Sequence, residues 1–238
     1  MSLIQDIEKF EPKNLVNSHF SICVAKRRSG KSVLVEDFIK KQFDSDALDV
    51  AILFTGTGAG FSMIKKEHRF NADQIDKLDD IVNNYQIMNE FNKIAGEQKD
   101  KFKIRTLIVL DDLALQYKSK EFSEKLCDLS VRGRHYSYKP LSLSFIVITQ
   151  KICMIPCVCR TNSDYIMFNN ISSMTELDTV MNENFFLKDS SRDGKKKARN
   201  LYNELVSSKP YLFIICENHR SNIHHYRDYV KSYVADYK

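Results

Sequence analysis

Residues 20–32 carry the side chains best suited to phosphate chemistry, in the order Phe-Ser-Ile-Cys-Val-Ala-Lys-Arg-Arg-Ser-Gly-Lys-Ser. An apolar segment, 22–24, precedes a polar loop, and an apolar pattern with helical spacing begins at Val33. Successive backbone N–H groups at a helix start bind anionic phosphate, and a glycine before them lets the backbone approach it closely. The order of residues therefore predicts a strand, a phosphate-binding loop and a helix.

Every residue of this loop, from position 25 to 32, is expected to contact a bound nucleotide. Lys31 is expected to reach the β- and γ-phosphates of ATP, and the Ser32 hydroxyl to bind magnesium. Ala25 stands where such loops usually have glycine. The loop can therefore form only if its geometry does not call for a positive φ at residue 25. The competing interpretation is a solvated basic turn. The predicted nucleotide contacts are Ala25, Lys26, Arg27, Arg28, Ser29, Gly30, Lys31 and Ser32.

Two acidic residues, Asp111 and Asp112, end a second apolar segment at 106–110. A buried parallel strand delivers such carboxylates to its carboxyl edge, beside the phosphate loop. We expect Asp111 to bind magnesium and Asp112 to orient the attacking water, although many ATPases have the longer glutamate at the second position. The alternative is an acid pair that caps the helix after the strand.

A polar pair, Thr149 and Gln150, ends the apolar segment that starts at residue 143. Buried amides need partners, so Gln150 is interpreted as a sensor of the γ-phosphate or of the attacking water. Arg132 and Arg134 end the helical pattern before this segment. Cations at a helix C-terminus stabilise the helix by about 0.3–1 kcal/mol, which is a sufficient explanation for the two arginines. Their position just before a buried strand also allows a catalytic role.

The elements that would position these groups alternate between short apolar runs and helical patterns, which is typical of an α/β protein with a mostly parallel sheet. We expect one P-loop domain at 18–216, preceded by a lead-in at 1–17 and followed by a tail at 217–238. Further expected strands are 50–54, 143–150, 165–168 and 211–216, the last of the chain, and the expected helices are 73–98, 119–136 and 174–181.

The composition, with 43% hydrophobic and 28% charged residues among 238, is typical of a globular protein. No apolar run is long enough to cross a bilayer, so no membrane insertion is expected. The first ten residues contain acids and no continuous apolar run, which is unlike a secretory signal. We therefore expect a reducing, cytosol-like compartment. The net charge of +5 permits binding to nucleic acid.

Three other segments have plain explanations beside chemical ones. Cys153, Cys157 and Cys159 lack paired CxxC spacing and a following histidine, so they are interpreted as reduced thiols and not as a zinc site. The glycine-rich segment 55–60 does not match GxGxxG and is interpreted as a turn at the end of a strand. The basic run 195–197 is interpreted as a solvated face, with DNA contact as the alternative.

The order of these motifs resembles the FtsK/HerA group of DNA-pumping ATPases, which have a RecA/FtsK-like P-loop fold. Within that group it is most similar to the genome-packaging ATPases of nucleocytoplasmic large DNA viruses and virophages, such as the poxvirus packaging ATPase. The resemblance covers residues 18–216. It implies a strand inserted between the loop strand and the acidic strand. It also implies a ring with ATP at subunit boundaries, completed by an arginine for which Arg134 is the first candidate and Arg132 and Arg160 the next.

The implied function is ATP-driven translocation of double-stranded DNA, without sequence specificity, into a preformed capsid. The implied cofactors are ATP and Mg²⁺, and the implied partners are a homo-oligomeric ring, hexamer or pentamer, and a capsid or portal-vertex protein. The implied location is the viral factory in the host cytoplasm, or the virion. A DNA helicase remains an alternative, as do a P-loop kinase of small molecules and a catalytically inactive scaffold.

Overall fold

The computed structural model describes residues 7–58, 60–95, 101–136, 140–171, 173–185, 191–220 and 228–236. In this part of the chain, eight strands form one sheet with the order β3-β2-β4-β5-β1-β6-β7-β8. The first six strands in this order are parallel to one another, whereas β7 and β8 are each antiparallel to the strand before. The strands are β1 (Phe20–Val24), β2 (Val50–Thr55), β3 (Arg69–Asn71), β4 (Arg105–Asp111), β5 (Ser142–Thr149), β6 (Tyr165–Phe168), β7 (Leu212–Glu217) and β8 (Val230–Val234).

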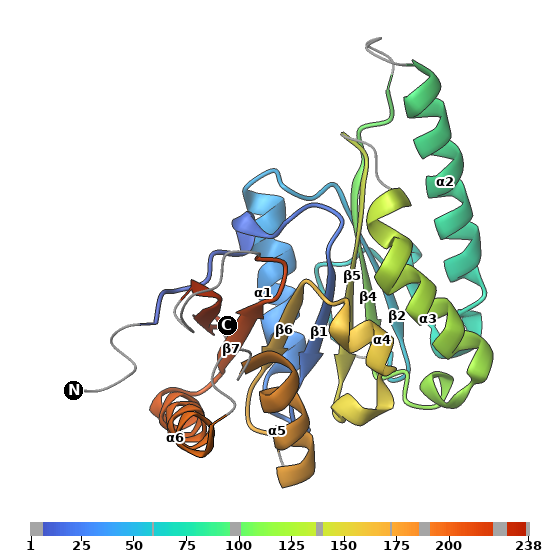
Figure 1. Ribbon diagram of the computed structural model, residues 1–238. Helices are drawn as coiled ribbons and strands as arrows, with labels where there is room; N and C mark the ends of the chain where they lie inside the picture. The colour runs from blue at the N-terminus through green and yellow to red at the C-terminus, as the bar shows by residue number, and fades with distance from the viewer. Residues whose placement is uncertain are drawn as a thin grey trace.

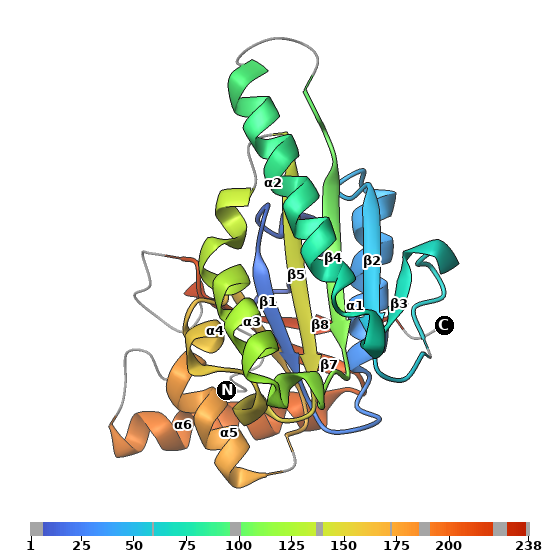
Figure 2. The ribbon, with the colours of Figure 1, turned by 90° about the vertical axis from the view of Figure 1, so that its right-hand side faces the viewer.

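Helices cover both faces of the sheet, which confirms the predicted α/β fold (Figure 1). One face is covered by α1, and the other by α2 and α3 with α4 beside them (Figure 2). The helices are α1 (Lys31–Asp44), α2 (Lys77–Ala95), α3 (Lys120–Arg132), α4 (Cys157–Thr161), α5 (Met174–Val180) and α6 (Arg192–Ser208).

The central strands are continuous apolar runs because each face of the sheet borders its own core. Along β1, Ile22 and Val24 pack into the core under α2 and α3, whereas Cys23 packs into the core under α1. All three side chains are fully buried. Burying an Ile or Val side chain contributes about 1.5–3 kcal/mol, so alternation along the strand secures both layers at once.

Two expected helices are shorter than their apolar patterns. The helix expected from residue 73 begins at Lys77, because Asn71 and Gln74 form a capping box around a separate 3-10 turn, Ala72–Gln74. Its expected end at residue 98 lies outside the described residues. The helix expected to reach residue 136 ends at Arg132 and continues as a 3-10 turn, Gly133–Tyr136.

The expectation that 211–216 is the last strand is wrong. β8 pairs with β7 over its length, from Cys216 opposite Val230 to Leu212 opposite Val234. The apolar signal of β8 is weak because this short edge strand carries Lys231, whose ammonium pairs with a carboxylate oxygen of Glu8 at 2.5 Å. The three-residue strand β3 at the other edge was also not predicted, for the same reason of length.

Candidate active site at the carboxyl edge of the sheet

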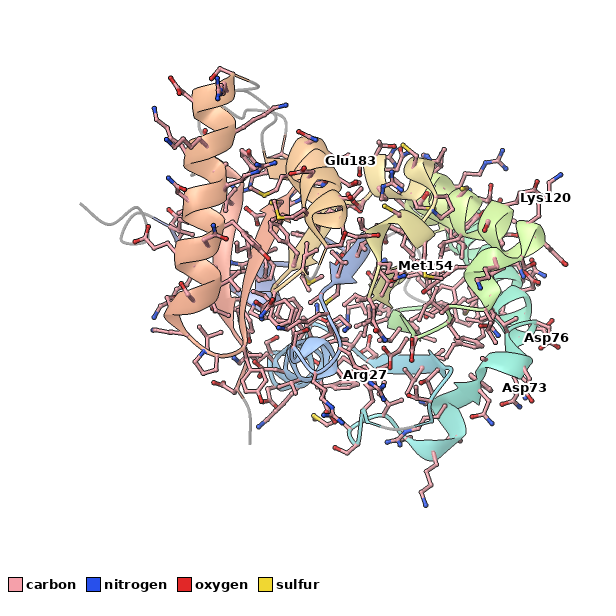
Figure 3. All side chains as sticks on the ribbon, turned by 90° about the horizontal axis from the view of Figure 1, so that it is seen from below. Arg27, Asp73, Asp76, Lys120, Met154 and Glu183 are labelled. Atoms are coloured by element: carbon pink, nitrogen blue, oxygen red, sulfur yellow. The ribbon has the colours of Figure 1, made fainter. Side chains whose placement is uncertain are left out.

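Three neighbouring strands bring the predicted chemical groups to one edge of the sheet. β5 lies between β1 and β4, with Val24 opposite Thr149 and Asp111 opposite Ile148. Because neighbouring strands lie about 4.8 Å apart, the ends of β1 and β4 are separated by about 10 Å. Figure 3 looks onto this edge, with Arg27 beside the start of α1. The inserted strand that the resemblance implies is therefore present.

The loop between β1 and α1 has the geometry expected of a phosphate-binding loop. Gly30 precedes α1 in the left-handed conformation, with φ 89°. The Lys31 ammonium donates hydrogen bonds to the carbonyl oxygens of Ala25 at 2.8 Å and Lys26 at 2.9 Å. Burial lowers the pKa of Lys31. Ala25 is not among the residues with positive φ, so the alanine fits this loop as predicted.

The end of β6 supports this loop from the side. The backbone N–H of Lys26 donates to the Asn170 carbonyl at 3.1 Å, and the Asn169 amide donates to the Ser29 carbonyl at 3.5 Å. The Ser29 hydroxyl in turn donates to the Lys26 carbonyl at 2.7 Å. These bonds hold the loop backbone in a fixed shape, so its free N–H groups can be aligned before any ligand arrives. The exposed members of the loop are Lys26, Arg27 and Arg28.

The two carboxylates at the end of β4 differ in burial. Asp111 is 7% exposed, whereas Asp112 is half-buried. Burial, followed by the like charge of Asp112, raises the pKa of Asp111 to about 6, and the charge of Lys31 opposes this rise. The carbonyl of Asp112 lies against Gly56, where an added Cβ would be 2.4 Å away. Gly56 is therefore needed for the close approach of the ends of β2 and β4.

The oxygen atoms at this edge fit a magnesium ion. No residue in the described part of the chain donates a hydrogen bond to the Asp111 or Asp112 carboxylate, so their oxygens remain available. Burial, followed by the like charge of Asp112, raises the pKa of Asp111, and a divalent cation beside the two carboxylates would favour their ionised forms. Ser32 lies in the first turn of α1, and Mg²⁺ takes oxygen ligands such as hydroxyls and carboxylates.

Asp111→Asn is expected to stabilise the protein in the absence of nucleotide and magnesium. At pH 8 the wild-type Asp111 carboxylate is ionised in both the folded and the unfolded chain. Keeping this charge in its buried site lowers the free energy of unfolding by an amount on the order of 2 kcal/mol. As pH falls through 6 the folded chain takes up the proton first, so the advantage of asparagine should shrink by pH 5. Thermal unfolding in EDTA at both pH values measures this.

The matched control for this measurement is Asp112→Asn, because Asp112 is the more exposed of the two acids. Two results would contradict the account of Asp111 as a buried carboxylate beside a like charge. One is an unfolding temperature of Asp111→Asn below that of wild type at pH 8, and the other is an increase in unfolding temperature that is as large at pH 5 as at pH 8.

Gln150 directly follows β5 and is exposed at the same edge as the two acids. A pocket of about 180 Å³ is lined by Asp112, Tyr117 and Gln150 among others. Figure 3 shows Met154, which also lines this pocket, near the middle of this face. The structure thus brings Asp112 and Gln150 to one pocket that has room for water, as a role for both in orienting water requires.

Arg132 and Arg134 lie at the opposite edge of the sheet. α3 begins after the end of β4 and runs back along the sheet, so its last residues are near the strand starts. Arg134 lines a small cleft with Asp164, which precedes β6. β1 alone, at about 3.3 Å per residue, separates the two edges by about 13 Å. Both arginines are exposed, and the Arg132 guanidinium pairs with Asp128 at 3.1 Å.

Arg160 is engaged within its own chain. Its guanidinium makes two bonds with the Glu183 carboxylate, at 2.8 and 2.7 Å, and a third with the Ile155 carbonyl at 2.6 Å. A bidentate pair of this kind fixes the side chain in one orientation. The geometry therefore favours Arg134 and Arg132 over Arg160 as a residue offered to a neighbouring molecule.

The cysteines are free thiols. Cys153 and Cys157 are exposed, whereas Cys159 is buried with its sulfur 3.7 Å from that of Cys127. Over the described ranges, no group of three or more histidine, cysteine or acidic side chains could hold a metal ion.

A comparison with protein families identifies the chain. A model of the poxvirus A32 protein family matches residues 7–229, nearly the whole sequence. The chain belongs to the poxvirus A32 protein family. This result confirms the predicted similarity to the poxvirus packaging ATPase. A comparison with proteins of curated function gives no match.

Solved structures share the fold of this A32 family member. The DNA-packaging ATPase B204 of Sulfolobus turreted icosahedral virus is 12% identical, with TM-score 0.55, and the match covers 92% of this chain and 98% of B204. B204 of Sulfolobus turreted icosahedral virus 2, in complex with ATP-gammaS, is 16% identical, with TM-score 0.54 and coverage of 91% and 98%. The cytoplasmic domain of the Thermomonospora curvata type VII secretion ATPase EccC is 14% identical, with TM-score 0.63 and coverage of 93% and 26%.

The described part of this A32 family member contains no helix with the length and apolar character of a membrane span. Sequence reasoning missed several residues of its site. Asn169 and Asn170 follow the apolar strand β6, which is the same signal that identified Thr149 and Gln150 after β5. Tyr211 also lies at this edge, against Gly30, but it gave no signal because it precedes an antiparallel strand.

Proposed function

We propose that this A32 family member uses Mg²⁺-dependent hydrolysis of ATP to move double-stranded DNA into a capsid. The observation that carries the proposal is the position of β5 between β1 and β4, which places the phosphate loop, the acid pair and Gln150 at one edge. A kinase of small molecules would need a pocket for its second substrate beside the loop. That need does not account for the polar pair Thr149 and Gln150 between the loop and the two acids.

The residues at this edge divide the work of hydrolysis. Lys31 exchanges its carbonyl partners in the loop for the β- and γ-phosphate oxygens and neutralises charge there. Ser32 and Asp111 would hold a magnesium ion, which would supply further positive charge to the phosphates. Asp112 accepts a hydrogen bond from the attacking water, and Gln150 fixes its position from the other side of the shared pocket.

The site is completed by a neighbouring copy of the chain. Arg134, or Arg132 beside it, is exposed at the edge opposite the loop, so it cannot reach its own nucleotide but can reach that of the next subunit. Repetition of such a head-to-tail contact generates a ring when the rotation between subunits closes, and the ring proposed here is a hexamer or pentamer. A ring of this kind would act with a capsid or portal-vertex protein, in the host cytoplasm or in the virion.

Contact with DNA is expected to involve phosphates and to be insensitive to sequence. The exposed lysines 195–197 on α6 are candidate contacts, whereas Arg199 is paired with Asp178. Affinity for duplex DNA should fall by about 0.9 log units per phosphate contact for each tenfold rise in salt. Fluorescence anisotropy with two duplexes of unrelated sequence measures both properties.

Replacing the three lysines by alanine should reduce the salt slope by about one for each lysine that touches a phosphate. Lys120→Ala, on the exposed start of α3, is the matched control and should leave the slope unchanged. Affinity that is independent of salt, or restricted to one sequence, contradicts the proposed motor.

A further inference from the structure

The ring of Tyr211 packs directly on the glycine of the phosphate-binding loop. A Cβ built on Gly30 would lie 2.3 Å from Cδ1 and 3.0 Å from Cε1 of Tyr211, so only glycine allows this contact. Tyr211 precedes β7, which is antiparallel to β6, and it therefore lies at the carboxyl edge of the parallel strands. A residue late in the chain is thus part of the wall of the nucleotide site.

The backbone of Tyr211 is held in an uncommon conformation. Its φ is 56°, in the left-handed region, which is rare for a bulky side chain and persists only where surrounding structure imposes it. The Tyr211 carbonyl accepts a hydrogen bond from the N–H of Ala235 at 3.2 Å, directly after β8. The side chain is half-buried and packs against the core under α1, so part of the ring remains exposed.

The segment that holds Tyr211 is itself fastened to α1. The Asp37 carboxylate, which is buried in α1, accepts hydrogen bonds from the Tyr233 hydroxyl at 2.6 Å and from the Asp236 N–H at 3.1 Å. Lys41, one turn further along α1, donates to the same Tyr233 hydroxyl at 2.7 Å. The loop helix, β8 and Tyr211 therefore form one connected support, which fixes the ring relative to the loop.

We propose that Tyr211 contacts the purine base of ATP, a role that rests on the proposed ATPase function. The groups expected at the γ-phosphate, Asp112 and Gln150, follow β4 and β5 on one side of β1. Tyr211 precedes β7, which lies on the other side of β1, beyond β6. A nucleotide whose γ-phosphate lies beside Asp112 and Gln150 would have its base toward this side. An aromatic ring offers a flat surface on which a base stacks, and such stacking is tolerant of base identity. Tyr211 would therefore contribute to affinity for any purine triphosphate.

The test compares two probes, ATP and inorganic tripolyphosphate, the second of which has no base. Tyr211→Leu keeps the apolar packing but removes the aromatic face, and Tyr211→Phe is the matched control that keeps it. Leucine is expected to weaken ATP binding about tenfold or more, with tripolyphosphate binding unchanged, and phenylalanine to preserve both. In steady-state assays the KM for ATP should rise with leucine while kcat is retained.

Two results would overturn the base contact. Equal weakening of ATP and tripolyphosphate by leucine means that the ring only supports the loop, and no weakening of either means that the base lies elsewhere. Thermal unfolding shows whether leucine perturbs the fold, in which case Tyr211→Met provides the same comparison. Wild-type turnover that duplex DNA does not stimulate would contradict the proposed function instead, whatever the Tyr211 variants show.

Discussion

Lys31→Ala is expected to reduce ATP hydrolysis to background. The Lys31 ammonium lies over the phosphate loop, where it donates hydrogen bonds to two loop carbonyls at 2.8 and 2.9 Å. Removing a single donor to transition-state charge in a water-poor site lowers turnover by about a hundredfold to a thousandfold. The loss should be at least this large here, because alanine removes a full positive charge. Release of inorganic phosphate measures it.

The matched control is Lys40→Ala, which removes a half-buried lysine from the same helix without touching the loop. Lys40→Ala should retain wild-type turnover, and both variants should unfold at similar temperatures. Full turnover by purified Lys31→Ala, with contaminating ATPases excluded, would show that residues 25–32 do not hold the phosphates.

Arg134→Ala is expected to lower turnover about a thousandfold or more while leaving ATP affinity nearly unchanged. An arginine that meets the transition state at a subunit boundary has an effect of this size, since its charge acts only when the phosphoryl group transfers. The structure supports action between subunits, because Arg134 is exposed at the sheet edge remote from its own loop.

A mixing experiment separates action between subunits from action within one. Subunits with Arg134→Ala have an intact loop, and subunits with Lys31→Ala have an intact arginine, so a mixed ring contains interfaces that pair the two intact groups. Mixing two inactive variants should therefore restore part of the activity. A mixture that stays inactive, although both variants fold and assemble together, contradicts the assignment of Arg134.

Arg132→Ala and Arg160→Ala complete the comparison. If Arg132 is the arginine that completes the neighbouring site, Arg132→Ala subunits, and not Arg134→Ala subunits, will be inactive alone and regain activity when mixed with Lys31→Ala subunits. Arg160→Ala should instead lower the unfolding temperature, because it leaves the Glu183 carboxylate without its bidentate partner. Full DNA-stimulated activity in a monomer would eliminate the shared site altogether.

The parts of the site that sequence could predict are those encoded locally. The Gly30-Lys31-Ser32 tripeptide follows an apolar strand, and Asp111 and Asp112 end another, so strand, loop and carboxylate edge can be inferred from neighbouring residues. The insertion of β5 between β1 and β4 followed only from the resemblance. Pairing between strands far apart in sequence is a property of the whole sheet, and residue spacing does not determine it.

The parts that sequence could not predict depend on distant partners. Tyr211 meets Gly30 only because β7 runs antiparallel beside β6, and its conformation depends on Ala235. β8 was missed because it is a short edge strand of five residues that includes a lysine, Lys231, so its apolar pattern is weak. The charge of Lys231 is satisfied by Glu8, which is far away in the sequence. Such elements are stabilised by tertiary contacts more than by local preference.

The measurement that tests the central claim most directly is the rate of ATP hydrolysis by the wild-type chain with and without long duplex DNA. Lys31→Ala provides the blank, and single-stranded DNA of the same length provides the comparison that a helicase would prefer. A translocating ring predicts magnesium-dependent hydrolysis that long duplex DNA stimulates without regard to sequence. Hydrolysis that is indifferent to duplex DNA, or that transfers phosphate to a small molecule, would contradict the account.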